Sequence, residues 1–196
     1  MTLGTLVGLG PVYGSTQGWT PVQIANFVGA PLAGSVVLQI PLGRLSDRVP
    51  RRGVMVICAL GATISCLIVS QLDGRSVLSL VLLFLLGGLA LPLYSMSVAY
   101  TNDWLEQQER TAAAALLIRM HGFGSFLGPL IAGLLLGIDL KAYFYFPVAI
   151  FATMTLYLMY RISFHAAPNL ESQTRFMPFP LRASRMVSEM FGREKR

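Results

Sequence analysis

The sequence predicts an all-α integral membrane protein, and three observations support that prediction. Of the 196 residues, 54% are hydrophobic and 12% are charged, against about 25% charged in a typical soluble domain. The mean hydropathy is +0.62. The charges are clustered, so uncharged apolar stretches recur along the chain. About 20 apolar residues are needed to cross a bilayer as a helix, and five such stretches argue against a soluble protein with a very apolar core.

Five segments are long enough to span a membrane, and a sixth is shorter. The long segments cover residues 21–42, 53–71, 76–100, 111–137 and 143–162. Residues 1–13 are also apolar, but as a helix they rise only about 20 Å against about 30 Å of hydrocarbon. We therefore expect a six-helix bundle over residues 1–163, with a truncated first helix that suggests a fragment or a mis-started reading frame. A basic tail covers residues 164–196.

The distribution of positive residues predicts the orientation of this bundle. The connections 14–20, 72–75 and 138–142 hold two cations, Arg75 and Lys141. The other side holds twelve, namely Arg44, Arg48, Arg51, Arg52, Arg110, Arg161 and six more in the tail. Because cytoplasmic loops of membrane proteins are rich in Lys and Arg, we expect the tail on the cytoplasmic side of the inner (plasma) membrane. The basic pI then reflects contact with the lipid bilayer, and no nucleic acid partner is expected.

The sequence gives no sign of an enzyme, a metal site or a cofactor. Cys58 and Cys66 fall on one predicted helix, roughly 12 Å apart along its axis, so we expect apolar fillers. The metal-protease and phosphate-loop motifs are absent. Ser76 ends a Gly-Arg-Ser sequence like the short motif of intramembrane serine proteases, but it is expected at the outer surface. The one histidine expected within a span, His121, lies nearer the cytoplasmic side.

A sequence rich in glycine and arginine follows the second predicted helix. Residues 43–52 read Gly-Arg-Leu-Ser-Asp-Arg-Val-Pro-Arg-Arg. Glycine permits a tight departure from a helix, and Asp47 can pair with a helix amino terminus or a guanidinium group. The arginines are expected to fix the topology and to reach lipid headgroups. The candidate residues of this conformational-switch loop are Gly43, Arg44, Asp47, Arg48, Arg51 and Arg52.

This loop resembles the G-x-L-x-D-R-x-x-R-R signature of the major facilitator superfamily, with Val49 or Pro50 in place of the usual second glycine. The resemblance implies a twelve-helix fold in two six-helix halves and secondary active transport by alternating access. The ending after a sixth span favours the carboxy-terminal half, and residues 91–103 look similar to a poorly characterised bacterial permease branch. The implied partners are a small-molecule substrate and either the missing amino-terminal half or a second copy. The resemblance also implies that Asp47 contacts the other half and stabilises the outward-facing state.

A second motif lies on the predicted segment 111–137, the fifth of the six, where residues 124–133 read Gly-Ser-Phe-Leu-Gly-Pro-Leu-Ile-Ala-Gly. Glycines four apart share one helix face and allow another helix to approach closely. A proline within a helix removes a hydrogen bond and can kink it. A similar pattern marks the fifth helix of many exporters of the family, which favours efflux, although tight packing alone also explains it. The candidate packing and kink residues are Gly124, Gly128, Pro129 and Gly133.

Two ionisable residues fall within this same span, where charge is costly and often functional. Arg119 and His121 are two positions apart and should point to nearly opposite faces. His121 shares its face with the glycines, so it is either a hydrogen-bonded structural residue or a proton- or substrate-binding one. Arg119 could bind an anionic substrate group, pair with an acid on another helix, or reach back to the cytoplasm. Weaker candidates for residues that line a cavity or contact a substrate are Asn26, Gln39, Tyr94 and Ser97.

The nine acidic residues are all expected in loops, at helix ends or in the tail. If transport is proton-coupled, the coupling acid would lie in the other half, or His121 would serve. Asp103, Glu106 and Glu109 precede the predicted segment 111–137, where negative charge suits a helix amino terminus. A non-transporting half-protein or a gene remnant with a structural or regulatory role remains the alternative to a carrier, and an intramembrane enzyme is a more remote one.

Overall fold

The structure, a computed structural model, describes residues 2–106 and 108–164, and this part of the chain is helical without a strand. The helices are α1 (Thr2–Thr16), α2 (Pro21–Arg48), α3 (Arg51–Val69), α4 (Val77–Ala90), α5 (Pro92–Asn102), α6 (Arg110–Leu136) and α7 (Ala142–Phe164). Among the described residues, five spans are long and apolar enough to cross a membrane, with α4 and α5 forming one of them. The all-α membrane fold expected from the sequence is confirmed. The predicted tail beyond Phe164 lies outside the described residues.

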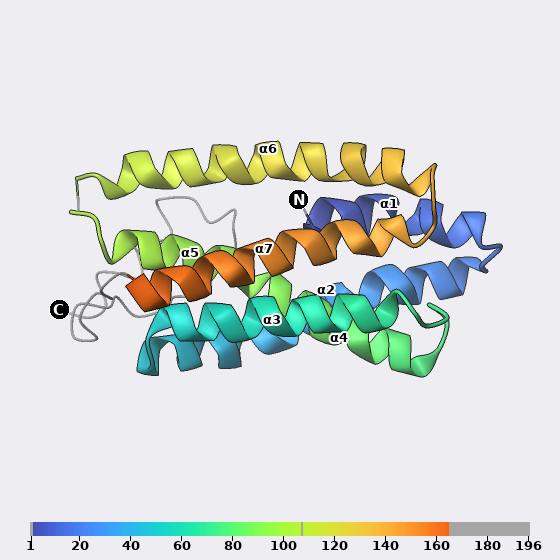
Figure 1. The fold of residues 1–196 in the computed structure, drawn as a ribbon, viewed down its shortest axis with the longest axis horizontal. Coiled ribbons are helices and arrows are strands. Elements are labelled where there is room, and N and C mark those ends of the chain that lie inside the picture. The colour runs from blue at the N-terminus through green and yellow to red at the C-terminus, as the bar shows by residue number, and fades with distance from the viewer. Residues whose placement is uncertain (1, 107, 165–196) are drawn as a thin grey trace, which may run out of the picture.

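Figure 1 shows the helices lying side by side in one elongated bundle. The α2–α3 and α5–α6 connections lie at one end with the carboxyl end of α7, and the α1–α2, α3–α4 and α6–α7 connections lie at the opposite end. The first end, called the basic end below, carries Arg48, Arg51, Arg110 and Arg161. α1 covers only part of the bundle length and begins near its middle (Figure 1).

The closest helix–helix approach links α2 to α4 through glycines on both helices. A Cβ atom at Gly34 would lie against the backbone of Phe84, and one at Gly87 would lie against the backbone of Pro31. The two main chains therefore touch directly, which only glycine allows at these positions. This contact was not expected from the sequence, because the glycines it uses do not form a repeat with a four-residue spacing on either helix.

The opposite end of the bundle is filled by aromatic rings from three helices and one loop. Tyr13 stacks on Tyr143 with ring centroids 4.9 Å apart, and it meets Trp19 edge-on at 5.5 Å. Phe27 and Phe144 complete the cluster, and all five side chains are buried. Because stacked and edge-on rings bury large areas in defined geometry, this cluster fixes how α1, α2 and α7 meet.

α2 is longer than the sequence suggested, and this changes the interpretation of the first motif. The helix continues through Gly43, which is buried, to Arg48, and Val49 and Pro50 alone connect it to α3. The expectation that the chain leaves the helix at Gly43 is therefore wrong. Pro50 ends the helix instead, since proline disfavours the helical conformation in the residue before it.

The segment predicted at residues 76–100 also differs from the expectation, because it is two helices rather than one. α4 ends at Ala90, and α5 begins at Pro92 after a single intervening residue, Leu91. Proline lacks an amide hydrogen and is tolerated in the first turn of a helix, but it disrupts a helix interior. The break places the first turns of α5 beside the cavity described next.

Candidate functional site

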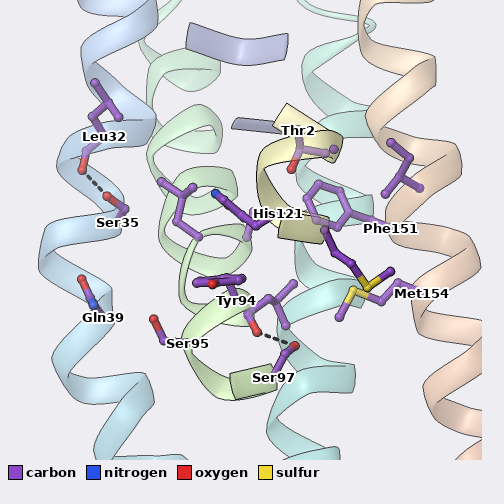
Figure 2. Close-up of a pocket in the computed structure, with 16 residues that line it drawn as sticks. Thr2, Leu32, Ser35, Gln39, Tyr94, Ser95, Ser97, His121, Phe151 and Met154 are labelled. Atoms are coloured by element: carbon purple, nitrogen blue, oxygen red, sulfur yellow. Dashed lines mark hydrogen bonds between the residues drawn. The ribbon is translucent and has the colours of Figure 1, made fainter. Parts of the chain in front are cut away.

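A cavity of about 650 Å³ lies among α2, α5, α6 and α7. Its volume falls within the range of about 300–1,000 Å³ that is typical of small-molecule sites. Figure 2 shows side chains from these four helices converging on it. The polar lining residues are Thr2, Ser35, Gln39, Tyr94, Ser95, Ser97 and His121, and the apolar ones include Leu32, Leu93, Met120, Ile150, Phe151 and Met154.

Tyr94 and His121 form the closest pair of aromatic rings in the cavity. Their ring centroids lie 4.4 Å apart with the planes tilted by 44°. Tyr94 extends from α5 and His121 from α6 (Figure 2), so the pair bridges two helices. Both rings also border the open space, and the pair is therefore available to a ligand.

Five of the seven polar lining residues divide into two sets. The hydroxyl of Ser35 donates to the carbonyl oxygen of Leu32 at 2.6 Å, and that of Ser97 donates to Leu93 at 2.7 Å. Hydroxyls bonded to their own helix backbone are already satisfied. By contrast, Gln39, the Tyr94 hydroxyl and His121 make no hydrogen bond with any other residue in the described part of the chain. These three can therefore bond to a ligand or to water.

At the basic end, Arg51 is a fully buried cation between two acids. Its Nε lies 3.0 Å from a carboxylate oxygen of Asp103, and both side chains are completely inaccessible to solvent. Its Nη2 lies 3.6 Å from Asp47. The expectation that this arginine reaches lipid headgroups is wrong. Asp103 was expected to favour the amino terminus of the following helix, but α6 begins seven residues later, and Asp103 instead pairs with α3.

Arg52 joins the same end of α3 to two further helices. Its Nε donates to the Tyr100 hydroxyl at 2.6 Å, and its Nη1 donates to the carbonyl oxygen of Arg161 at 3.0 Å. The guanidinium carbon also lies 5.3 Å from the centroid of the Tyr100 ring, within the range of a cation–π contact. Arg52 is 4% exposed, so it too is a structural cation, whereas Arg44 and Arg48 are exposed.

The comparisons with known proteins agree with this geometry. Residues 1–194 match the profile of the Major Facilitator Superfamily. The chain belongs to the major facilitator superfamily. An uncharacterised MFS-type transporter of Enterobacter sp. strain 638 is 28% identical over 136 residues, which cover 69% of this chain and 35% of the relative. The uncharacterised MFS-type transporter YcaD of Salmonella paratyphi B is 27% identical over 139 residues, with the same two coverages.

Membership in the superfamily identifies the chain as an integral membrane protein of a transporter family. Its five candidate spans and all-α fold are consistent with part of a six-helix major facilitator half. The matched region covers 35% of each relative, so the chain spans about a third of the length of the relatives it matches.

The structure brings together several of the polar residues that the sequence suggested for a major facilitator cavity. Gln39, Tyr94, Ser97 and His121 all line the cavity. Asn26 does not, since it is exposed on α2 outside the lining. Sequence reasoning missed the contributions of α7, Phe151 and Met154 among them, because apolar residues in a span give no signal that separates a cavity wall from a lipid-facing surface.

Arg119 also lies outside the cavity, on the side of α6 turned away from it. It is exposed, as are Leu116, Phe123 and Phe126 at helical spacing on either side, which are 58%, 65% and 69% accessible. Arg119 makes no hydrogen bond or ion pair with any other residue in the described ranges. These four residues are called the α6 stripe below.

The glycine-proline motif of α6 packs against α1. Gly124 and Gly128 are buried, and the Pro129 ring would lie 3.1 Å from a Cβ atom at Gly4 and 3.6 Å from one at Gly8. α6 runs uninterrupted from Arg110 to Leu136. Gly133 is less constrained, because a Cβ atom there would make only an ordinary contact with Leu9 at 3.8 Å.

The remaining charges and possible metal ligands lie away from the cavity. At the end opposite the basic one, Arg75 donates hydrogen bonds to both carboxylate oxygens of Asp73, which lowers the pKa of that exposed carboxyl. Over the residues that the structure describes, no group of three His, Cys, Asp or Glu side chains could hold a metal ion. Cys58 and Cys66 are both 0% exposed and make no disulfide.

Proposed function

We propose that this chain is the carboxy-terminal half of a secondary active transporter that moves a small molecule by alternating access. The observation that supports this most is the cavity of about 650 Å³ with Gln39, Tyr94 and His121 available to a ligand. In carriers built from two repeats, the substrate site lies at the repeat interface, and one half rocks against the other. The cavity would be this half's share of that site.

The partner in this proposal is an amino-terminal half rather than a second copy, and the α6 stripe supports that choice. A guanidinium group in an apolar surface favours a partner that supplies an acid or a carbonyl group. Of the acids that the structure describes, Asp47 and Asp103 pair with Arg51 at the basic end and Asp73 pairs with Arg75 at the other. The other described acids, Glu106, Glu109 and Asp139, lie in the connections. A second copy would therefore offer Arg119 carboxylates only near the ends of the bundle, whereas a different half can supply one deeper in the membrane.

The basic end is proposed to face the cytoplasm from the inner membrane, since Lys and Arg accumulate on that side. Asp47, at this end, is proposed to contact the other half and to stabilise the outward-facing state. Its side chain lies 3.6 Å from Arg51 and keeps 22% of its accessibility, so it is not closed off from a partner at this end. Efflux is the proposed direction, supported by the resemblance of the Gly124–Gly133 motif to that of exporters.

Two experiments test the proposal in order. The first reads the source genome upstream of the Met1 codon. An in-frame continuation encoding six further spans would support a two-half carrier, and stop codons directly upstream would favour a non-transporting half-protein or gene remnant. The second reconstitutes the assembled carrier in proteoliposomes and compares it with its Asp47→Asn variant. Unchanged transport and unchanged inward and outward populations would contradict the role of Asp47.

The direction of transport needs a separate measurement. Everted and right-side-out membrane vesicles that contain the assembled carrier are compared for uptake of the same substrate. For an exporter, uptake is expected in the everted vesicles, because their outer face is the former cytoplasmic face. Uptake confined to right-side-out vesicles would show that the carrier works as an importer, and the efflux part of the proposal would fall.

A further inference from the structure

We propose that the cavity wall formed by this chain binds the uncharged, planar aromatic body of a substrate that also carries a hydrogen-bond-accepting oxygen. The inference rests on the proposed transport function and narrows its substrate class. It follows from three properties of the lining. These are its lack of Asp, Glu, Lys and Arg, its aromatic and thioether side chains, and its hydrogen-bond donors that make no bond within the described part of the chain.

The part of the ligand that this wall binds should be uncharged, because the lining does not suit a charged group. The residues that border the cavity include no Asp, Glu, Lys or Arg, and Arg119 lies on the outward side of α6. With His121 neutral, an ion placed against such a wall would lose hydration without gaining a counter-charge, which is far more costly than burying a neutral polar group. A compound that is neutral over this surface binds without that cost.

The apolar part of the lining suits a flat ring. Tyr94 and His121 present tilted rings 4.4 Å apart, and Phe151 adds a third aromatic side chain from α7. Aromatic rings bind other rings by offset or edge-on contact. Met120 and Met154 complete this surface, and flexible, polarisable thioethers adapt to rings of different outline.

The donors that make no hydrogen bond within the described part of the chain define which polar group the ligand must carry. The hydroxyls of Ser35 and Ser97 already donate hydrogen bonds to carbonyl oxygens of their own helices. The Gln39 amide on α2 and the Tyr94 hydroxyl on α5 remain available as donors, with His121 beside Tyr94 (Figure 2). A site with unpaired donors discriminates strongly in favour of ligands that carry a matching acceptor. A carbonyl, lactone or ether oxygen on the ring system meets this requirement.

The test measures protection of a cysteine placed in the cavity wall of the full 196-residue chain in lipid nanodiscs. Ser35→Cys is the reporter, because the hydroxyl it removes is already bonded to its own helix. A water-soluble methanethiosulfonate reagent labels the cysteine, while natural Cys58 and Cys66 are 0% exposed and serve as a blank. Ser15→Cys, exposed at the end of α1 outside the lining, is the matched control.

Two probes share one ring system and differ in charge. Coumarin is neutral, planar and carries a lactone carbonyl, and coumarin-3-carboxylate adds an anionic group. Coumarin is expected to slow labelling at position 35 by the factor 1 + [L]/Kd, about threefold at twice its Kd, and to leave position 15 unaffected. The carboxylate at the same concentration should protect neither position. Tyr94→Phe should raise the Kd of coumarin about fivefold through loss of one hydrogen bond, whereas Tyr145→Phe, outside the cavity, should not.

The outcomes separate the two proposals. Protection by the carboxylate equal to that by coumarin would overturn the uncharged requirement. If the reagent labels Ser35→Cys readily but neither probe protects it, the substrate class is wrong while the cavity and the transport proposal stand. If Ser35→Cys does not react at all, the cavity is closed to water, and the proposed substrate site falls together with this inference.

Discussion

Arg51 Nε lies 3.0 Å from a carboxylate oxygen of Asp103, and neither side chain is accessible to solvent. The pair joins the start of α3 to the residue that follows α5, two segments separated by about a quarter of the chain. Removing one partner of a buried ion pair leaves an uncompensated charge, and that cost exceeds the net contribution of the intact pair. The basic end of the bundle should therefore depend strongly on Asp103.

The first prediction is that Asp103→Asn destabilises the chain by about 3 kcal/mol, because the buried Arg51 loses its nearer counter-charge and keeps only the more distant Asp47 as an acid partner. The measurement is thermal unfolding in detergent, followed with a thiol-reactive dye that reports exposure of Cys58 and Cys66. Both thiols are 0% exposed in the folded chain, so they react only as it opens.

Asp73→Asn is the matched control for this prediction, because it breaks an ion pair that is about half exposed, with side-chain accessibilities of 49% and 54%. Exposed pairs contribute little to stability, so its Tm should barely change. Equal loss of Tm in the two variants would contradict the special role of the buried pair.

A second prediction concerns the contact between α2 and α4. In Gly87→Ala the new methyl group meets the backbone of Pro31, and main chain cannot move aside as a flexible side chain can. Overpacking of this kind costs about 1–3 kcal/mol, so the Tm of this variant should fall. Gly29→Ala is the control on α2, since a Cβ atom there meets nothing within 4 Å, and alanine favours a helix by up to about 1 kcal/mol. A similar fall in Tm in both variants would contradict the structure, because it would mean that the two glycines have equivalent surroundings.

Much of the fold could be predicted from the sequence, because long apolar runs and clustered charges limit where helices can lie. The segment predicted at residues 111–137 corresponds to α6 (Arg110–Leu136). The tertiary contacts were harder to predict. Gly34 meets the backbone of Phe84 and Gly87 meets that of Pro31, and nothing near either glycine in sequence identifies its partner. Asp103 lies close to the next helix in sequence, yet its partner in space is Arg51.

The candidate site was predictable only where a polar residue interrupts an apolar span. His121 stood out because an ionisable group within a membrane span is costly. Gln39 and Tyr94 stood out as polar residues on the spans that line the cavity in the family that the sequence resembles. Phe151 and Met154 could not be found in this way, since lipid, a packed core and a cavity wall all select apolar side chains. Asn26 satisfied the same polar criterion but lies near the amino end of α2, exposed and outside the lining.

A third prediction uses the two tryptophans to test the aromatic cluster. Trp19 is 7% exposed within the cluster, whereas Trp104 is 54% exposed. The Trp104→Phe variant, in which Trp19 is the fluorophore, should show blue-shifted emission and weak quenching by acrylamide in detergent. Trp19→Phe should show the reverse, with strong quenching of Trp104. Equal quenching of the two variants would mean that the cluster is open to solvent.

The last prediction tests whether a second copy covers the α6 stripe. Phe123 lies one helical turn from Arg119, and both are exposed, so two copies meeting through this face would bring two guanidinium groups together. Like charges facing each other cost several kcal/mol. Phe123→Cys should therefore form few disulfide-linked dimers in membranes, no more than Leu156→Cys on the exposed face of α7, which is 68% accessible. Adding Arg119→Leu should raise dimer formation about tenfold or more by removing that repulsion. Quantitative cross-linking of Phe123→Cys with Arg119 intact would instead identify a second copy as the partner, and the proposed amino-terminal half would no longer be needed to explain the stripe.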